Sequence, residues 1–222
     1  MIKAVIFDMD GTLFDTESVY TNAWRAAGHE LNFAPIEQAI AACTGRNAKD
    51  TRRYFEENFA DLITYDTFIA VRDRYYDEAI AERGVPVKPG AVELLGYLKA
   101  SGIKIALATA TRTERVEYNL AVTGLRDYFD VRITGDMVEN GKPHPETFLR
   151  AAECFGLPPS ECMGVEDSFN GVRAIRAAGM FTVMVPDVVP PTKEIEALLD
   201  AKCETLSEIR PLIEKLNQSQ TR

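Results

Sequence analysis

The hydrophobic pattern of this chain changes its period after the first strand and again near residue 85. Ala4–Phe7 is a short, continuous apolar run, which is typical of a strand buried on both faces of a parallel sheet. From Val19 to Ile80 the apolar positions recur at helical spacing, and no segment alternates as a half-buried strand does. Beyond Gly84, short apolar runs alternate with amphipathic segments. The pattern therefore predicts a block of helices and an alternating α/β region.

The alternating region predicts an α/β fold built on a doubly wound, mostly parallel sheet of Rossmann-like type. Strands are expected at 4–7, 103–108, 131–134, 163–165 and 182–185, and helices at 91–100, 113–123, 145–155 and 169–178. The tail from Thr192 is expected to be helical. Because one strand precedes the helical block and the others follow it, the block would be an insertion. We expect a core of residues 1–16 and 85–222 and an inserted helical domain of residues 17–84.

The inserted block predicts four helices. The first runs over 19–27 and is expected to end at Gly28, and the second covers 35–43. The third starts at Asn47 and continues to Phe59, and the fourth is capped by Thr64 or Asp66. Aromatic residues at helical spacing, among them Tyr20 and Trp24, are expected to form the core of this block.

Composition and charge narrow the class of protein. The 222 residues are 46% hydrophobic and 27% charged, which is ordinary for a globular protein. Acidic residues outnumber basic ones by 34 to 25, so the formal charge of −9 argues against nucleic-acid or anionic-membrane partners. No run approaches the ~18 apolar residues of a membrane span. The four cysteines lack metal or redox spacing. We expect a cytoplasmic monomer with reduced thiols.

Polar side chains follow four of the predicted strands, beyond the carboxyl end of each strand. They are Asp8 and Asp10 after the first strand, Thr109 and Thr111 after the second, Lys142 after the third, and Glu166 and Asp167 after the fourth. The carboxyl ends of parallel strands open into the same crevice. The sequence therefore predicts that four carboxylates, one ammonium group and two hydroxyls converge there.

Such a cluster needs more positive charge than Lys142 provides, because four carboxylates at close range cannot all ionise unaided. A hard divalent cation with oxygen ligands would supply it, and few carboxylates plus waters favour Mg²⁺ over Ca²⁺. Asp8 would then be an ionised oxygen nucleophile that can form an aspartyl-phosphate. Asp10 would protonate the leaving alkoxide and later deprotonate water. Thr109 and Lys142 would hold the transferring oxygens.

The same residues resemble the four motifs of the haloacid dehalogenase superfamily. The matching stretches are Asp8-Met9-Asp10-Gly11-Thr12, Thr109, Lys142 in Gly-Lys-Pro-His-Pro-Glu, and Glu166-Asp167 in Gly-Val-Glu-Asp-Ser-Phe-Asn-Gly. The helical insertion after the first motif is similar to the cap of the branch that contains β-phosphoglucomutase and sugar-phosphate phosphatases. The resemblance covers essentially the whole chain.

This resemblance implies roles for individual residues. Asp8 would be the nucleophile and Asp10 the general acid and base. Mg²⁺ would be bound by Asp8, the carbonyl of Asp10 and Asp167, with Glu166 as a ligand or a supporting residue. Thr109, Thr111, the amide of Ala110 and Lys142 would hold the phosphorylated substrate, and Arg46 is the candidate contact from the cap.

Each motif also has a purely structural interpretation. Asp8 and Asp10 could form a solvated turn, Thr109 could cap a helix, and Lys142 could be a surface lysine. Glu166 with Asp167 could serve only a helix dipole. The occurrence of all four motifs in order at strand ends favours the catalytic interpretation.

The sequence is compatible with three functions. The expected one is Mg²⁺-dependent hydrolysis of a small sugar or polyol phosphate. A β-phosphoglucomutase-type phosphomutase would use the same aspartyl-phosphate, but Thr12, Tyr20 and Ala48 depart from the mutase pattern. A module that only binds a phosphorylated metabolite is the third. Asp10 argues against dehalogenases and phosphonate hydrolases, which lack an acid there.

Overall fold

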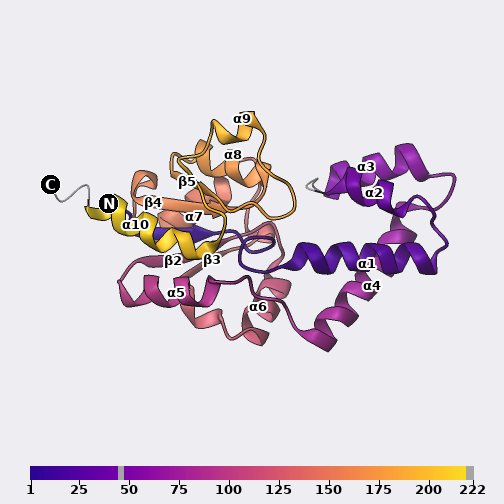
Figure 1. Cartoon of the computed structure of the whole chain (residues 1–222), viewed down its shortest axis with the longest axis horizontal. Helices are drawn as coiled ribbons and strands as arrows, with labels where there is room; N and C mark the ends of the chain where they lie inside the picture. The colour runs from indigo at the N-terminus through magenta and orange to yellow at the C-terminus, as the bar shows by residue number, and fades with distance from the viewer. Residues whose placement is uncertain (45–47, 219–222) are drawn as a thin grey trace. The chain divides into compact units, whose positions relative to one another are not determined.

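The computed structural model describes residues 1–44 and 48–218, and Figure 1 shows its helices and strands. The chain divides into two compact units. One consists of Met1–Asp15 together with Val87–Arg222, and the other of Thr16–Pro86. Arg46, which the sequence nominates as a substrate contact, lies outside the described residues.

The first unit is built on a six-stranded sheet in which all neighbours pair in parallel. Its strands are β1 (Ala4–Phe7), β2 (Lys104–Ala108), β3 (Val131–Ile133), β4 (Cys162–Glu166), β5 (Phe181–Met184) and β6 (Ala201–Lys202), in the order β3-β2-β1-β4-β5-β6. Phe7 lies opposite Leu107 of β2 on one side and Val165 of β4 on the other. The predicted doubly wound parallel sheet is confirmed, and its order reverses at β1, where such folds bind ligands.

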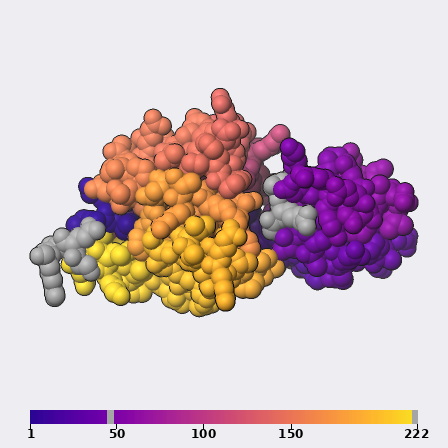
Figure 2. Space-filling view, turned by 90° about the horizontal axis from the view of Figure 1, so that it is seen from above, coloured from indigo at the N-terminus to yellow at the C-terminus, as the bar shows by residue number. Residues whose placement is uncertain are grey.

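Helices lie on both sides of this sheet (Figure 1). They are α5 (Ala91–Ala100), α6 (Thr113–Val122), α7 (Glu146–Cys154), α8 (Phe169–Ala177) and α10 (Ile209–Gln218), with short helices η1 (Arg126–Tyr128), η2 (Gly135–Met137) and η3 (Pro159–Glu161). Phe148 of α7 and Ile175 of α8 pack with Ile6 in a shared hydrophobic cluster. Every residue of β1 is buried, and atoms of the orange and yellow segments form much of the surface of this unit in Figure 2.

The tail departs from the expected continuous helix. It forms a short helix α9 (Lys193–Glu196), strand β6, the short helix η4 (Leu206–Glu208) and α10. Val183 and Met184 of β5 pair with Ala201 and Lys202, so the edge of the sheet recruits these two residues. The helical prediction for the whole tail is therefore wrong, because a two-residue strand is too short to show alternation in the sequence.

The two ends of the first unit are held together. The backbone N–H of Ile2 donates to Oδ1 of Asn217 at 2.7 Å, and Nδ2 of Asn217 donates back to the carbonyl of Ile2 at 3.3 Å. These bonds attach α10 to the residues that lead into β1. The central strand is thereby fixed at its amino end, opposite the edge where Asp8 emerges.

The second unit contains the four expected helices and no strand among its described residues, although the predicted start of the third helix at Asn47 lies outside those residues. They are α1 (Thr16–Glu30), α2 (Ile36–Cys43), α3 (Ala48–Phe59) and α4 (Tyr65–Arg83). Their core is a cluster of large rings that includes Trp24, Phe33, Phe55 and Phe68. Thr64 caps α4 by accepting from the N–H of Thr67.

The sequence predicted that the first helix ends at Gly28, and this prediction is wrong. α1 continues to Glu30. A Cβ at Gly28 would lie 2.7 Å from Cγ1 of Ile36, so the glycine lets the start of α2 approach α1. Among the described helices, none has the length and apolar character that crossing a bilayer requires.

Candidate active site

Three acidic side chains gather where β1 and β4 end. Ligand oxygens of Asp8, Glu166 and Asp167 lie within 4.8 Å of one another. Strand pairing brings them together, because the N–H of Asp8 donates to the carbonyl of Val165 at 2.9 Å. Asp8 is 6% exposed and Glu166 only 1%. Two of the three carboxylates are therefore held away from water at the carboxyl edge of the sheet.

Lys142 reaches this cluster from the segment between β3 and α7. Its Nζ lies 2.5 Å from Oδ1 of Asp8 and 2.7 Å from Oε1 of Glu166. The ammonium group also lies 5.0 Å from the centroid of the Phe148 ring. The side chain is only 8% exposed. Residues far apart in the sequence thus form a buried cluster of carboxylates around one ammonium group.

The cluster is short of positive charge. Burial raises the pKa of Asp8 to about 7, the charges of Glu166 and Asp10 add to this, and Lys142 only partly offsets it. Burial would lower the pKa of Lys142, but the charges of Asp8 and Glu166 raise it above its ordinary value. A hard cation with oxygen ligands fits these acids, because it would favour the ionised form of Asp8.

Glu166 is held at both carboxylate oxygens. Oε2 accepts from the backbone N–H groups of Asp167 at 2.9 Å and Ser168 at 2.6 Å, and Oε1 accepts from Lys142. A Cβ at Gly171 would lie 1.7 Å from Oε1. Glycine in the first turn of α8 therefore leaves the space that the buried carboxylate occupies.

Gly11 leaves room for Asp167, and Thr12 is hydrogen-bonded to it. Gly11 has φ 81°, and a Cβ there would lie 2.3 Å from Oδ2 of Asp167. Thr12 Oγ1 donates to Oδ1 of the same carboxylate at 3.0 Å. Sequence reasoning did not find this contact of Thr12, although a hydroxyl directly after the glycine of the first motif was the available signal.

Asp10 and the two threonines after β2 form a second group. The Thr111 hydroxyl donates to Oδ2 of Asp10 at 2.6 Å, and the backbone N–H of Thr111 donates to Oγ1 of Thr109 at 3.1 Å. Thr109 is buried directly beyond β2, and Ala110 is exposed beside it. The Asp10 carboxylate is not one of the three clustered acids.

Glu146 organises the segment that carries Lys142. Its carboxylate accepts from the backbone N–H groups of Glu139 and Asn140, both at 2.9 Å, and from Nδ2 of Asn140 at 3.0 Å. The hydrogen bonds from these two amides lower the pKa of Glu146. The Glu146 carboxylate, at the start of α7, thus restrains the residues just before Lys142. The sequence gave no clear indication of these hydrogen bonds.

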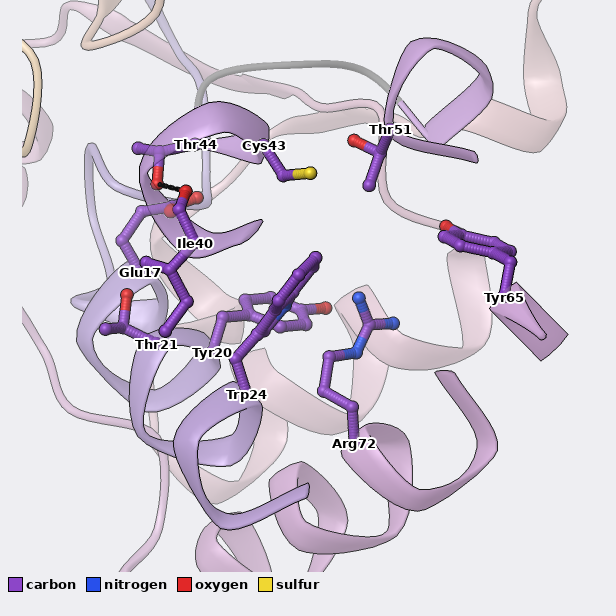
Figure 3. Close-up of a pocket in the computed structure, with 10 residues that line it drawn as sticks. All are labelled: Glu17, Tyr20, Thr21, Trp24, Ile40, Cys43, Thr44, Thr51, Tyr65 and Arg72. Carbon is purple, nitrogen blue, oxygen red and sulfur yellow. Dashed lines mark hydrogen bonds between the residues drawn. The ribbon is translucent and has the colours of Figure 1, made fainter. Parts of the chain in front are cut away.

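The helical unit contains a cavity of about 330 Å³ (Figure 3). It is lined by Glu17, Tyr20, Thr21, Trp24, Ile40, Cys43, Thr44, Thr51, Tyr65 and Arg72. The guanidinium carbon of Arg72 lies 5.4 Å from the ring centroid of Tyr20 and 6.0 Å from that of Trp24. Tyr20 and Trp24, which the sequence favoured as core residues over ligands, line this cavity.

The wound sheet, its buried acids and the inserted helical unit define a class of hydrolases. The family model of the haloacid dehalogenase-like hydrolases matches residues 2–179. The chain belongs to this family, so the predicted superfamily and the prediction of an enzyme are confirmed.

The similarity to individual proteins extends over most or all of the chain. Protein CbbY of Rhodobacter capsulatus is 36% identical over 83% of this chain and 86% of its own length. The phosphorylated carbohydrates phosphatase of Thermotoga maritima is 31% identical over 98% of this chain and 99% of its own. The crystal structure of β-phosphoglucomutase from Clostridium difficile covers 100% of both chains, with a TM-score of 0.75 and 27% identity.

Proposed function

We propose that this protein is a Mg²⁺-dependent phosphatase that hydrolyses a small sugar or polyol phosphate through an aspartyl-phosphate at Asp8. The observation that carries the proposal is the buried Asp8 carboxylate, 2.5 Å from Lys142 and grouped with Glu166 and Asp167. Oxygen nucleophiles of this kind form covalent phosphoryl intermediates. The name of the Thermotoga maritima relative supports a phosphorylated carbohydrate as the substrate class.

The proposed reaction has two displacements. In the first, a carboxylate oxygen of Asp8 attacks phosphorus, the bond to the ester oxygen breaks, and Asp10 gives its proton to that leaving oxygen. In the second, Asp10 takes a proton from water, and the water oxygen attacks the phosphorus of the aspartyl-phosphate. Inorganic phosphate leaves, and the carboxylate of Asp8 is restored. Lys142 offsets negative charge on the transferring oxygens throughout.

The chain also offers residues to hold the metal. Asp8, Asp167 and the carbonyl of Asp10 are the proposed ligands, and a bound Mg²⁺ supplies positive charge to the phosphoryl oxygens. Glu166 is better suited to a supporting role, because its two oxygens already accept hydrogen bonds from Lys142 and from backbone amides. Thr12 would keep Asp167 oriented for the metal.

The lining of the cavity in the helical unit supports the proposal that the substrate is polyhydroxylated. Its lining offers hydroxyl groups, a carboxylate and aromatic faces, together with the guanidinium group of Arg72. Aromatic faces suit the apolar side of a sugar, and hydroxyl and charged groups suit its hydroxyls. The volume of about 330 Å³ falls in the range of small-molecule sites.

A phosphomutase is the second candidate, because a β-phosphoglucomutase structure matches the chain over its whole length. Both reactions pass through the same aspartyl-phosphate and differ in whether water or a sugar hydroxyl receives the phosphoryl group. Thr12, Tyr20 and Ala48, which depart from the mutase pattern, favour water. Interconversion of hexose 1- and 6-phosphates, stimulated by a trace of hexose bisphosphate, would identify the mutase instead.

The proposal is tested by measuring phosphate release from a panel of sugar, polyol and other metabolite phosphates. Mg²⁺ should support turnover of at least one sugar or polyol phosphate, and EDTA should remove it reversibly. A generic aryl phosphate serves as the reference substrate. If the protein releases no phosphate from any compound with Mg²⁺, and binds the metabolites unchanged, it is a binding module rather than an enzyme.

Glu146→Gln tests the segment that carries Lys142. An amide offers one acceptor oxygen and turns an NH₂ group toward a backbone N–H, so the bonds to Glu139 and Asn140 cannot all persist. We expect kcat/KM to fall about tenfold, since small displacements of charged groups in active sites are costly. Glu153→Gln, at an exposed position of the same helix, should leave kcat/KM unchanged. Equal activity of the two variants would contradict this role of Glu146.

A further inference from the structure

The hydroxyl of Thr111 contacts the proposed proton carrier rather than a position where substrate would bind. Its Oγ1 donates to Oδ2 of Asp10 at 2.6 Å. This is a short hydrogen bond between two half-buried side chains from different strand ends. The sequence grouped Thr111 with the residues that hold substrate, so the contact gives it another task.

The backbone of Thr111 is held in place by two hydrogen bonds to other residues. Its N–H donates to Oγ1 of Thr109, and its carbonyl accepts from the N–H of Gly135 at 2.9 Å. A Cβ at Gly135 would lie 2.1 Å from the carbonyl oxygen of Ala110, so only glycine permits this approach. The peptide that carries Thr111 is thus fixed on both sides, and its hydroxyl is presented in a defined direction.

The backbone of Asp10 is fixed as well. The turn that follows β1 is closed by bonds from the N–H groups of Leu13 and Phe14 to the carbonyl of Met9, both at 3.0 Å. Gly11 N–H donates to the carbonyl of Phe14 at 2.8 Å. The bond from Thr111 therefore restricts rotation of the Asp10 side chain and sets the direction of its carboxyl group.

We propose that Thr111 is a positioning residue that directs Oδ1 of Asp10 to the proton transfer. Because Oδ2 accepts the hydroxyl of Thr111, the proton of the carboxylic acid is carried on Oδ1. This proton passes to the leaving ester oxygen as its bond to phosphorus breaks, and Thr111 keeps its own proton. The inference rests on the proposed phosphatase chemistry of Asp8 and Asp10.

Thr111→Val removes the hydroxyl and keeps the shape of the side chain. Two substrates separate proton transfer from phosphate binding: a sugar phosphate, whose alkoxide needs a proton to leave, and 4-nitrophenyl phosphate, whose leaving group is stable as an anion. The quantity to compare is kcat/KM, which reports only the steps up to departure of the leaving group. We expect it to fall about 10- to 100-fold for the sugar phosphate and less than threefold for 4-nitrophenyl phosphate.

Thr111→Ser retains a hydroxyl and should restore most of the sugar-phosphate activity, while Thr111→Ala should show the same split as Thr111→Val. Thr205→Val, at an exposed position, is the matched control and should behave as the wild type. Equal losses for both substrates, or no loss, would overturn the positioning role. If the wild type hydrolyses neither substrate, the proposed function itself fails, and the inference with it.

Discussion

Asp8→Asn is expected to abolish phosphate release, with kcat reduced by about 10⁴-fold or more. The amide has no anionic oxygen, so it cannot attack phosphorus. The folded protein should tolerate the change, because burial already raises the pKa of Asp8 to about 7 and a neutral group removes that penalty. Lys142 retains Glu166 as its partner. Phosphate release and the temperature of thermal unfolding, both measured on the purified variant, check the two expectations.

The matched control is Asp61→Asn, at an exposed position of the helical unit, which should keep wild-type activity. Acid quenching of the wild type during turnover should trap a phosphorylated protein, and the Asp8→Asn variant should trap none. Turnover of Asp8→Asn within tenfold of the wild type would rule out Asp8 as the nucleophile.

Lys142→Met is expected to impair both activity and stability. Activity should fall about 10²- to 10³-fold, as when one donor to a developing oxyanion is removed. The free energy of unfolding without metal should fall by about 3–5 kcal/mol, because the change leaves Asp8 and Glu166 buried without their cation. Mg²⁺ that binds the folded state should recover part of the stability. Lys104→Met, at an exposed position of β2, is the control.

The loss of stability in Lys142→Met should depend on pH. The folded pKa of Asp8, about 7, lies above its ordinary value of 3.8, so its contribution to stability is complete below 3.8 and is lost as pH rises through about 7. Without Lys142 the folded pKa rises further, and the ionised acid is opposed more strongly. Urea unfolding without metal should therefore show a larger difference from the wild type at pH 8 than at pH 5. A difference that is constant with pH would contradict this account.

Much of the fold could be predicted because its signals are local. The apolar run of β1, the alternation after Gly84 and the helical spacing between them each reflect which faces of an element are buried. Two mistakes share one cause. Strand β6 forms by pairing with β5, and the glycine at position 28 lies within α1, where Ile36 packs against it. Where a distant partner determines the local structure, the residues themselves show no periodic pattern from which that structure could be predicted.

The sequence by itself determined which chemical groups stand at the strand ends. Asp8, Lys142, Glu166 and Asp167 follow recognisable motifs, and the parallel sheet brings them to one edge. Their catalytic roles remain proposals that the variants above test. The motifs and their order along the chain also indicated the family, which the family model over residues 2–179 confirms.

Only the tertiary structure decided how these groups are paired. It placed Lys142 between Asp8 and Glu166, the hydroxyl of Thr12 on Asp167, and the hydroxyl of Thr111 on Asp10. Hydrogen bonds depend on direction over distances of about 3 Å, and such directions arise from packing between segments that are up to 155 residues apart. The motifs identify the candidate reacting groups, whereas packing determines which partner each carboxylate oxygen contacts.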